Sequence, residues 1–162
     1  MDADSRLGYL IYEISRLYGR RFDRRARDSL GLSRAQCHLL IAVAMHENDP
    51  PYRRAPYPGE DPTPVLTQIA LAEMLSMTAM GVTKLCDRME AMGWIRREVL
   101  AGDRRVKVIR LEPKARKGLM SALELGTRLQ EQSLGGLSAE ESAQLLGLLR
   151  RVRGNLLALG SS

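Results

Sequence analysis

Residues 71–111 of the chain read LAEMLSMTAMGVTKLCDRMEAMGWIRREVLAGDRRVKVIRL. Two short helical patterns, residues 68–75 and 79–92, meet here at the turn Ser76-Met77, and Thr67 and Thr78 are expected to cap them. On a helical wheel the second pattern gathers its apolar residues on one side: Val82, Leu85, Cys86, Met89 and Met92. The opposite side presents Met80, Thr83, Lys84, Asp87 and, at its edge, Arg88. A helix with an apolar back and a short polar front is typical of an element that enters the major groove of DNA.

Two strand-like runs follow this helix, residues 94–100 and 106–111, and they predict a β-hairpin. We expect a tight turn through Gly102 and Asp103, with Asp103, Arg104 and Arg105 at the tip. A charged tip is common in hairpins of every function. After a groove-binding helix, however, it indicates a wing whose arginines reach an adjacent minor groove, with Asp103 orienting Arg105 through a charge-assisted hydrogen bond. The whole pattern predicts a winged helix-turn-helix.

Further helical patterns flank this unit on both sides. The first is expected to begin near Asp4 or Ser5 and to end at Gly31, with an apolar stripe of Leu7, Leu10, Ile11, Ile14, Leu17, Tyr18 and Phe22. Two leucine-rich helices follow Leu111, one opening at Pro113 and one behind a capping box at residues 138–141. The apolar surface of these helices exceeds what a small winged domain can cover, which indicates a helical homodimer interface.

The predicted fold class is therefore mainly α with a small β-hairpin. Residues 1–30 and 112–162 are assigned to homodimerisation, and residues 31–111 to the winged helix-turn-helix. Within the latter, a capping box at Ser33 opens a strongly apolar helix that is expected to be central to the core. A loop over residues 49–64 holds six of the seven prolines. This loop either folds over a neighbouring surface through Tyr52 and Tyr57 or is locally disordered.

Charge and composition narrow the function classes. The chain has 162 residues, a net charge of +6 and few aromatic residues, which favours a helical core and suits a polyanionic partner. An arginine-rich end of the first helix is interpreted either as a solvated face or as a phosphate-contacting shoulder: Arg20, Arg21, Arg24, Arg25 and Arg27. The two cysteines, Cys37 and Cys86, lie on apolar helical faces without metal-ligand spacing and are expected to be buried thiols.

The same residues argue against several other functions. No catalytic motif or phosphate-binding glycine loop occurs, so we expect neither an enzyme nor a cofactor. The histidines and cysteines form no ligand cluster, so we expect no metal. No signal peptide and no membrane-spanning run is expected, and the expected compartment is the cytoplasm.

The sequence resembles the MarR family of bacterial transcription regulators. The resemblance runs from about Ser5 to Leu157, and the segments that carry it are GLSRAQ at 31–36, LTQIALAEML at 66–75, VTKLCDRMEAMGWI at 82–95, GDRR at 102–105 and VIRL at 108–111. It implies a homodimer that binds double-stranded DNA at a near-palindromic site, usually as a repressor, and that is often released by a small aromatic or phenolic ligand or by thiol oxidation. It places groove contacts on Thr78, Met80, Gly81, Thr83 and Lys84, and wing contacts on Arg104 and Arg105 with Asp103 as their partner.

The resemblance also implies a ligand pocket, for which Tyr12, Arg16, His38 and Met45 are the candidates. Arg16 with His38 would suit a carboxylate, which motivates an aromatic-acid ligand. Two features depart from the family pattern: the long 49–64 insertion, and Met80-Gly81 in place of polar residues. These leave two alternatives open, a protein-interaction module that has lost specific DNA binding and a regulator that responds to thiol oxidation.

Overall fold

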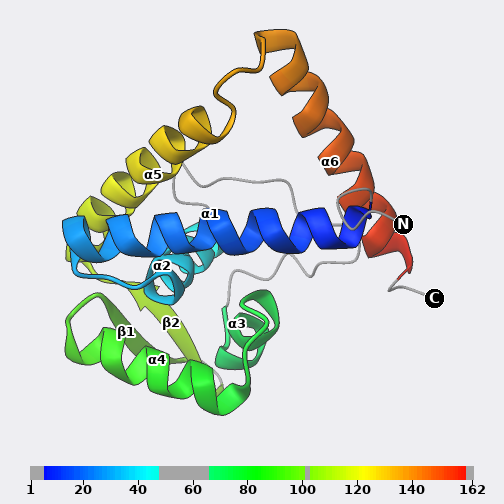
Figure 1. The fold of residues 1–162 in the computed structure, drawn as a ribbon. Helices are drawn as coiled ribbons and strands as arrows, with labels where there is room; N and C mark the ends of the chain where they lie inside the picture. The colour runs from blue at the N-terminus through cyan, green and yellow to red at the C-terminus, as the bar shows by residue number, and fades with distance from the viewer. Residues whose placement is uncertain (1–5, 48–65, 101–102, 160–162) are drawn as a thin grey trace. The chain divides into compact units, whose positions relative to one another are not determined.

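The computed structural model describes residues 6–47, 66–100 and 103–159, with the side chains of residues 100 and 103–106 excepted. The expected 49–64 loop and the capping residues Asp4 and Ser5 lie outside the described residues. Within them, the elements are α1 (Leu7–Leu30), α2 (Arg34–His46), α3 (Gln68–Met74), α4 (Ala79–Ala91), β1 (Ile95–Leu100), β2 (Asp103–Leu111), α5 (Pro113–Ser133) and α6 (Ala139–Leu159) (Figure 1). The chain divides into two compact units, residues 1–126 and residues 127–162, which are described separately.

Local sequence signals account for most helix ends. The Ser33 side chain accepts a hydrogen bond from the Gln36 N–H while the Gln36 side chain accepts one from the Ser33 N–H, so the predicted capping box opens α2. Thr67 and Thr78 cap α3 and α4 as predicted. Gly31 ends α1 with φ of 65°, a conformation that costs glycine little. The start of α1 differs from the expectation, because it follows Arg6, which makes no side-chain capping bond.

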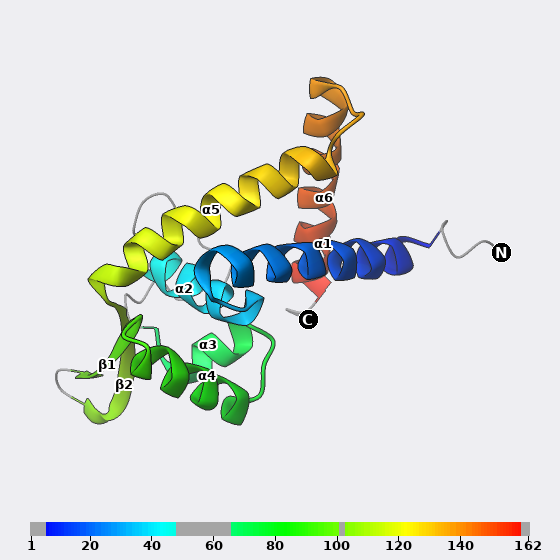
Figure 2. The ribbon, with the colours of Figure 1, turned by 60° about the vertical axis from the view of Figure 1, so that its left-hand side comes forward.

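The core of the first unit is built around α2. Leu39, Leu40 and Val43 are almost completely buried on this helix, which contacts α1, α3, α4 and β2. The predicted apolar back of α4 is also buried, with Val82, Leu85, Cys86 and Met89 enclosed, while Ile95 and Ile109 bring the hairpin against the same core. Figure 2 shows α4 running beside the base of this hairpin. The polar front of α4 therefore faces outward because its back is held by the core.

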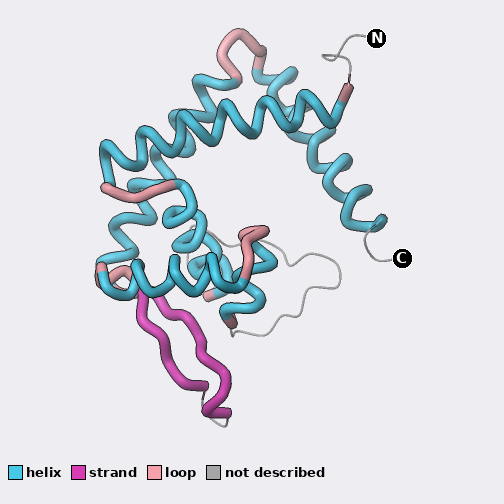
Figure 3. The backbone as a smooth tube through the Cα atoms, turned by 60° about the horizontal axis from the view of Figure 1, so that its bottom comes forward, coloured by secondary structure: helices cyan, strands magenta, loops and turns pink. Residues whose placement is uncertain are grey.

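The hairpin is antiparallel and its turn is shorter than expected. Ile95 pairs with Leu111 and Val99 with Lys107; an irregularity then follows, and Leu100 pairs with Asp103. β2 therefore includes Asp103, Arg104 and Arg105, and the prediction that placed these residues in the turn is wrong. A bridge between Thr67 and Val108 adds a short third segment at the other edge of β2. The strands extend away from the helices of the first unit in Figure 3.

Several large apolar side chains remain exposed in each unit. On α1 these include the stripe residues Leu7, Leu10, Ile11, Ile14 and Leu17, and on α6 they include Leu148, Leu149, Leu156, Leu157 and Leu159. No residue of α6 is buried. Among the described helices, none is by itself long and apolar enough to cross a membrane; only α3 and α4 together, bent by 108° at their break, pass on length and composition.

Candidate nucleic-acid interface

The front of α4 is an open surface above a buried back. Thr78, Thr83, Lys84 and Arg88 are exposed, and Met80 is 69% exposed. Met92, which the helical wheel placed on the buried side, is instead 37% exposed. The reason is that α4 ends at Ala91, so Met92 is the C-cap and lies at the rim, where its sulfur accepts a hydrogen bond from the Gln36 amide at 3.7 Å. The exposed front and the buried back otherwise agree with the wheel.

The first turn of α4 is tightly closed by its cap. The Thr78 hydroxyl oxygen accepts a hydrogen bond from the Gly81 N–H at 3.1 Å. A Cβ atom added to Gly81 would lie 3.1 Å from Thr78 Oγ1, closer than most Cβ contacts, and 3.4 Å from Met77 Cε, which is an ordinary contact. Glycine therefore keeps the cap uncrowded, a local packing reason that sequence reasoning did not consider. The expected close approach of DNA to Gly81 stays a prediction.

The charged residues of this surface fall into two groups. Lys84 and Arg88 are four residues apart and so share a face of the helix, and neither forms an ion pair with any residue that the structure describes. Asp87 is already engaged, because its carboxylate accepts a hydrogen bond from the Arg97 guanidinium. The front of α4 thus carries two exposed cations, and the one carboxylate beside them is already paired with Arg97. Such a pattern of charge attracts the phosphates of DNA.

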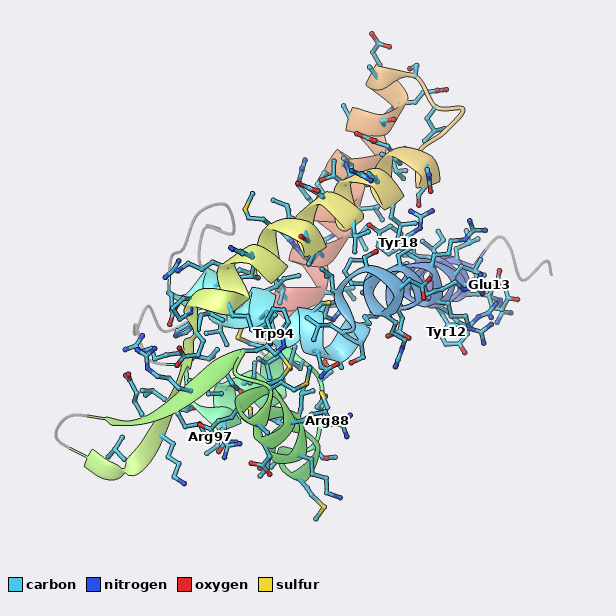
Figure 4. The ribbon with its side chains drawn as sticks, turned by 90° about the vertical axis from the view of Figure 1, so that its left-hand side faces the viewer. Tyr12, Glu13, Tyr18, Arg88, Trp94 and Arg97 are labelled. Carbon is cyan, nitrogen blue, oxygen red and sulfur yellow. The ribbon has the colours of Figure 1, made fainter. Side chains whose placement is uncertain are left out.

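Arg97 is a structural residue of the interface that sequence reasoning missed. It lies beside α4 in Figure 4, and its side chain is only 16% exposed. Besides Asp87, it meets Glu90: the Glu90 carboxylate accepts the Arg97 backbone N–H at 2.8 Å, and Arg97 Nε lies 3.7 Å from Glu90 Oε2. β1 is thereby attached to α4, which fixes the direction of the hairpin relative to this helix. The available signal was strand alternation, since Arg97 shares its face with the buried Ile95 and a charge on such a face needs a partner.

The opposite face of the hairpin is covered by alternating charges. Arg96 donates to Glu98 at 2.7 Å and to Glu112 at 3.4 Å, and Arg110 lies 3.6 Å from Glu98 and 3.8 Å from Glu47. The hydrogen bond from Arg96 lowers the pKa of Glu98, so this carboxylate stays ionised at neutral pH. Because these arginines are neutralised within the protein, they are poor candidates for phosphate contacts. The side chains of Asp103, Arg104 and Arg105 lie outside the described residues, so their roles remain predictions.

The four candidate ligand residues are dispersed over α1 and α2. Tyr12 is exposed, Met45 is half-buried, and Arg16 forms an ion pair with Glu13 at 3.1 Å. His38 lies near the Phe22 ring, with centroids 6.4 Å apart. Although the residue is exposed overall, loss of water around the ring and the neighbouring Arg34 lower the pKa of His38, so its imidazole is neutral at pH 7. A neutral ring attracts a carboxylate less than the expected pairing of Arg16 with His38 requires.

Both cysteines are buried free thiols, as predicted. Burial raises the pKa of Cys37 to about 11 and also raises the pKa of Cys86. Because the thiolate is the reactive form, these environments suppress oxidation at neutral pH. Within the described residues, no three His, Cys, Asp or Glu side chains come together as a metal site.

Comparison with known proteins agrees with this architecture. The MarR family model matches residues 30–106. Transcriptional regulator HosA of Escherichia coli O127:H6 is 35% identical over 89 residues, which make up 55% of this chain and 66% of HosA, just under two thirds of its length. The crystal structure of transcriptional regulator PA3341 matches with a TM-score of 0.71 at 29% identity, covering 94% of this chain and 99% of that one.

A DNA complex is also among the similar structures. The S. aureus MepR–DNA complex matches with a TM-score of 0.69 at 22% identity, covering 96% of this chain and 99% of that chain, a likeness that concerns the fold alone. The family match spans most of the winged region, including α4 and the first part of β2. With its helical fold, its hairpin and its match to the MarR family model over residues 30–106, the chain is similar to MarR-family transcription regulators.

Proposed function

We propose that this chain is a homodimeric, DNA-binding transcription regulator that represses its target genes until a small aromatic or phenolic ligand releases it. The observation that carries DNA binding is the front of α4, where Lys84 and Arg88 are exposed on one helix face above a fully packed back. Such a helix can enter a major groove without rearranging the core. Its cations suit phosphate oxygens and guanine edges.

The supporting argument for a homodimer is the exposed apolar surface. Ile14 on α1 and Leu156 on α6 are both about 60% exposed, with further exposed leucines on each helix. Soluble monomers rarely leave large contiguous apolar surface in water, and a second copy is the simplest cover. A symmetric dimer would present two α4 helices to a near-palindromic site with half-sites about 34 Å apart. As a regulator of genes it would act in the cytoplasm, the expected compartment.

Release by a ligand is supported by the position of Arg16. Its ion pair with Glu13 is a partly exposed pair three residues apart, of a kind worth at most about 1 kcal/mol. An aromatic carboxylate could therefore displace Glu13 at little cost, with Tyr12 on the same helix offering its ring. Calorimetry with a panel of aromatic acids and phenols tests this step; binding that is equal in Arg16→Ala, or no binding at all, would refute it.

DNA binding is tested by fluorescence anisotropy with duplexes from the region upstream of the protein's own gene. Affinity should fall steeply with salt, because each neutralised phosphate contributes about −0.9 to the slope of log K against log salt. Lys84→Ala should flatten that slope by about one unit. The matched control is Lys117→Ala, which removes the same charge from an exposed position on α5 and should leave the slope unchanged.

Two outcomes would contradict the proposal. Equal slopes for Lys84→Ala and Lys117→Ala would show that net charge, rather than the α4 surface, governs binding. A failure to bind any upstream duplex, at low salt and without ligand, would favour a protein-interaction module on the same fold. Footprinting completes the test, since a dimer should protect two symmetric half-sites.

A further inference from the structure

The residue on the front of α4 that the charge argument leaves unexplained is Met80. It is the second residue of the helix, and 69% of its surface is exposed. We propose that Met80 reads the C5-methyl group of a thymine in the major groove and so determines part of the sequence specificity. This inference rests on the proposed DNA binding and adds the chemistry of one base contact.

The hydrogen-bonding capacity of the neighbouring side chains points in this direction. The Thr83 hydroxyl donates to the Ala79 carbonyl oxygen at 3.0 Å, so its proton is committed, and it offers DNA only a lone pair and a methyl group. Asp87 is engaged by Arg97. The exposed side-chain donors are Thr78, at the cap, and Lys84 and Arg88, one and two turns beyond Met80. Between Thr78 and Lys84, the side chains of Ala79, Met80 and Gly81 offer no hydrogen bond to the polar edges of guanine, adenine or cytosine.

Thymine is the base that such a turn fits. In the major groove each base pair shows a distinct pattern, and only thymine adds an apolar group, its C5-methyl. Residues of the N-terminal part of a recognition helix are the ones that usually contact base edges, which is where Met80 lies. Methionine is unbranched and polarisable, so it can adapt to a small methyl group.

The residues around Met80 favour a contact with a base over a binding surface for another protein. Its neighbours at three and four residues along the face are Thr83 and Lys84, which are both exposed and polar. Gly81, next in sequence, has no side chain, and the cap leaves little room for one. A single apolar side chain between polar ones matches a single methyl group flanked by hydrogen-bonding edges. It does not form the continuous apolar area that a protein partner would need.

The experiment removes the methyl group and nothing else. A duplex is selected in vitro from a random library with the full-length protein, then prepared in two forms, with thymine and with deoxyuridine throughout. Anisotropy is measured for wild type, for Met80→Ala and for the matched control Ile69→Ala, which truncates another highly exposed apolar residue, on α3 (73% exposed). Met80→Ala is not expected to affect folding, because the side chain is mostly in water.

Wild type should bind the deoxyuridine duplex more weakly, by about fourfold per lost contact and about fifteenfold for two half-sites, from the value of one buried methyl-sized group. Met80→Ala should bind the thymine duplex more weakly than wild type and should not distinguish the two duplexes. Ile69→Ala should keep the wild-type ratio. Replacing thymines one at a time should locate the effect at one position in each half-site.

Equal binding of both duplexes by wild type would overturn the inference while leaving DNA binding intact. The same holds if Met80→Ala keeps the wild-type ratio, or if Ile69→Ala abolishes it. A loss spread evenly over all thymines would also overturn it, because that result indicates altered DNA stiffness rather than a contact. If the selection recovers no duplex, the proposed function itself fails.

Discussion

Gly118 and Gly126 lie on the same helix, α5, and should respond to alanine in opposite directions. An added Cβ at Gly118 would lie 2.8 Å from Cη2 of Trp94 and closer still to Cζ3, whereas one at Gly126 would meet nothing within 4 Å. Trp94 is 7% exposed, and the Lys114 ammonium lies 4.7 Å from the centroid of its ring. The ring therefore has little freedom to move away.

The magnitudes follow from two effects. Alanine in place of glycine within a helix gains about 1 kcal/mol, which should appear undiminished at Gly126. At Gly118 this gain is opposed by overpacking of about 1–3 kcal/mol, so we expect a net loss of about 1–2 kcal/mol. With about 2–4 °C per kcal/mol for a chain of this size, the two variants should melt on opposite sides of wild type.

Scanning calorimetry at one fixed protein concentration measures this difference, because the melting temperature of a dimer depends on concentration. Trp94 is the only tryptophan of the chain, so its fluorescence reports on the same contact. Its emission should change in Gly118→Ala and stay as in wild type in Gly126→Ala. A Gly118→Ala protein that is as stable as Gly126→Ala, with unchanged emission, would show that α5 does not pack on Trp94 as described.

Two further predictions concern the interface and the thiols. Arg97→Met should lower the free energy of unfolding, measured by urea titration, by about 1–2 kcal/mol, a value between those of exposed and buried ion pairs. It should also weaken DNA binding, because the wing loses its attachment to α4. The control Arg96→Met should remain close to wild type, and equal effects of the two substitutions would refute the role of Arg97. Cys37 and Cys86 should react slowly with iodoacetamide at pH 8 in the folded protein and rapidly in denaturant. The pKa of Cys37 is about 11 in the folded protein and 9.0 for an ordinary thiol. The stabilising contribution of the protonated Cys37 thiol should therefore be constant below pH 9 and should be lost as the pH rises from 9 to 11. Rapid alkylation of the folded protein would contradict this reasoning.

The sequence predicted those parts of the fold that depend on neighbours three or four residues away. The capping threonines, the Ser33 capping box and the buried face of α4 are of this kind, and the structure confirms them except for Met92, which is exposed. The hairpin was predicted as an element, but its turn was placed wrongly. Residue preferences show where a turn is tolerated, whereas the pairing of Leu100 with Asp103 decides where the strands end.

The interface divides in the same way. Periodicity alone identified Met80, Thr83, Lys84 and Arg88 as one exposed face, because a helix that buries its apolar side must expose the other. Tertiary structure alone decided which charges on and around that face are available. Asp87 looked like part of the face and is held by Arg97 from the following strand, while Arg16, expected beside His38, is paired with Glu13. Ion pairs of this kind depend on distances between side chains in the folded protein, and helical periodicity orders residues around an axis without setting those distances.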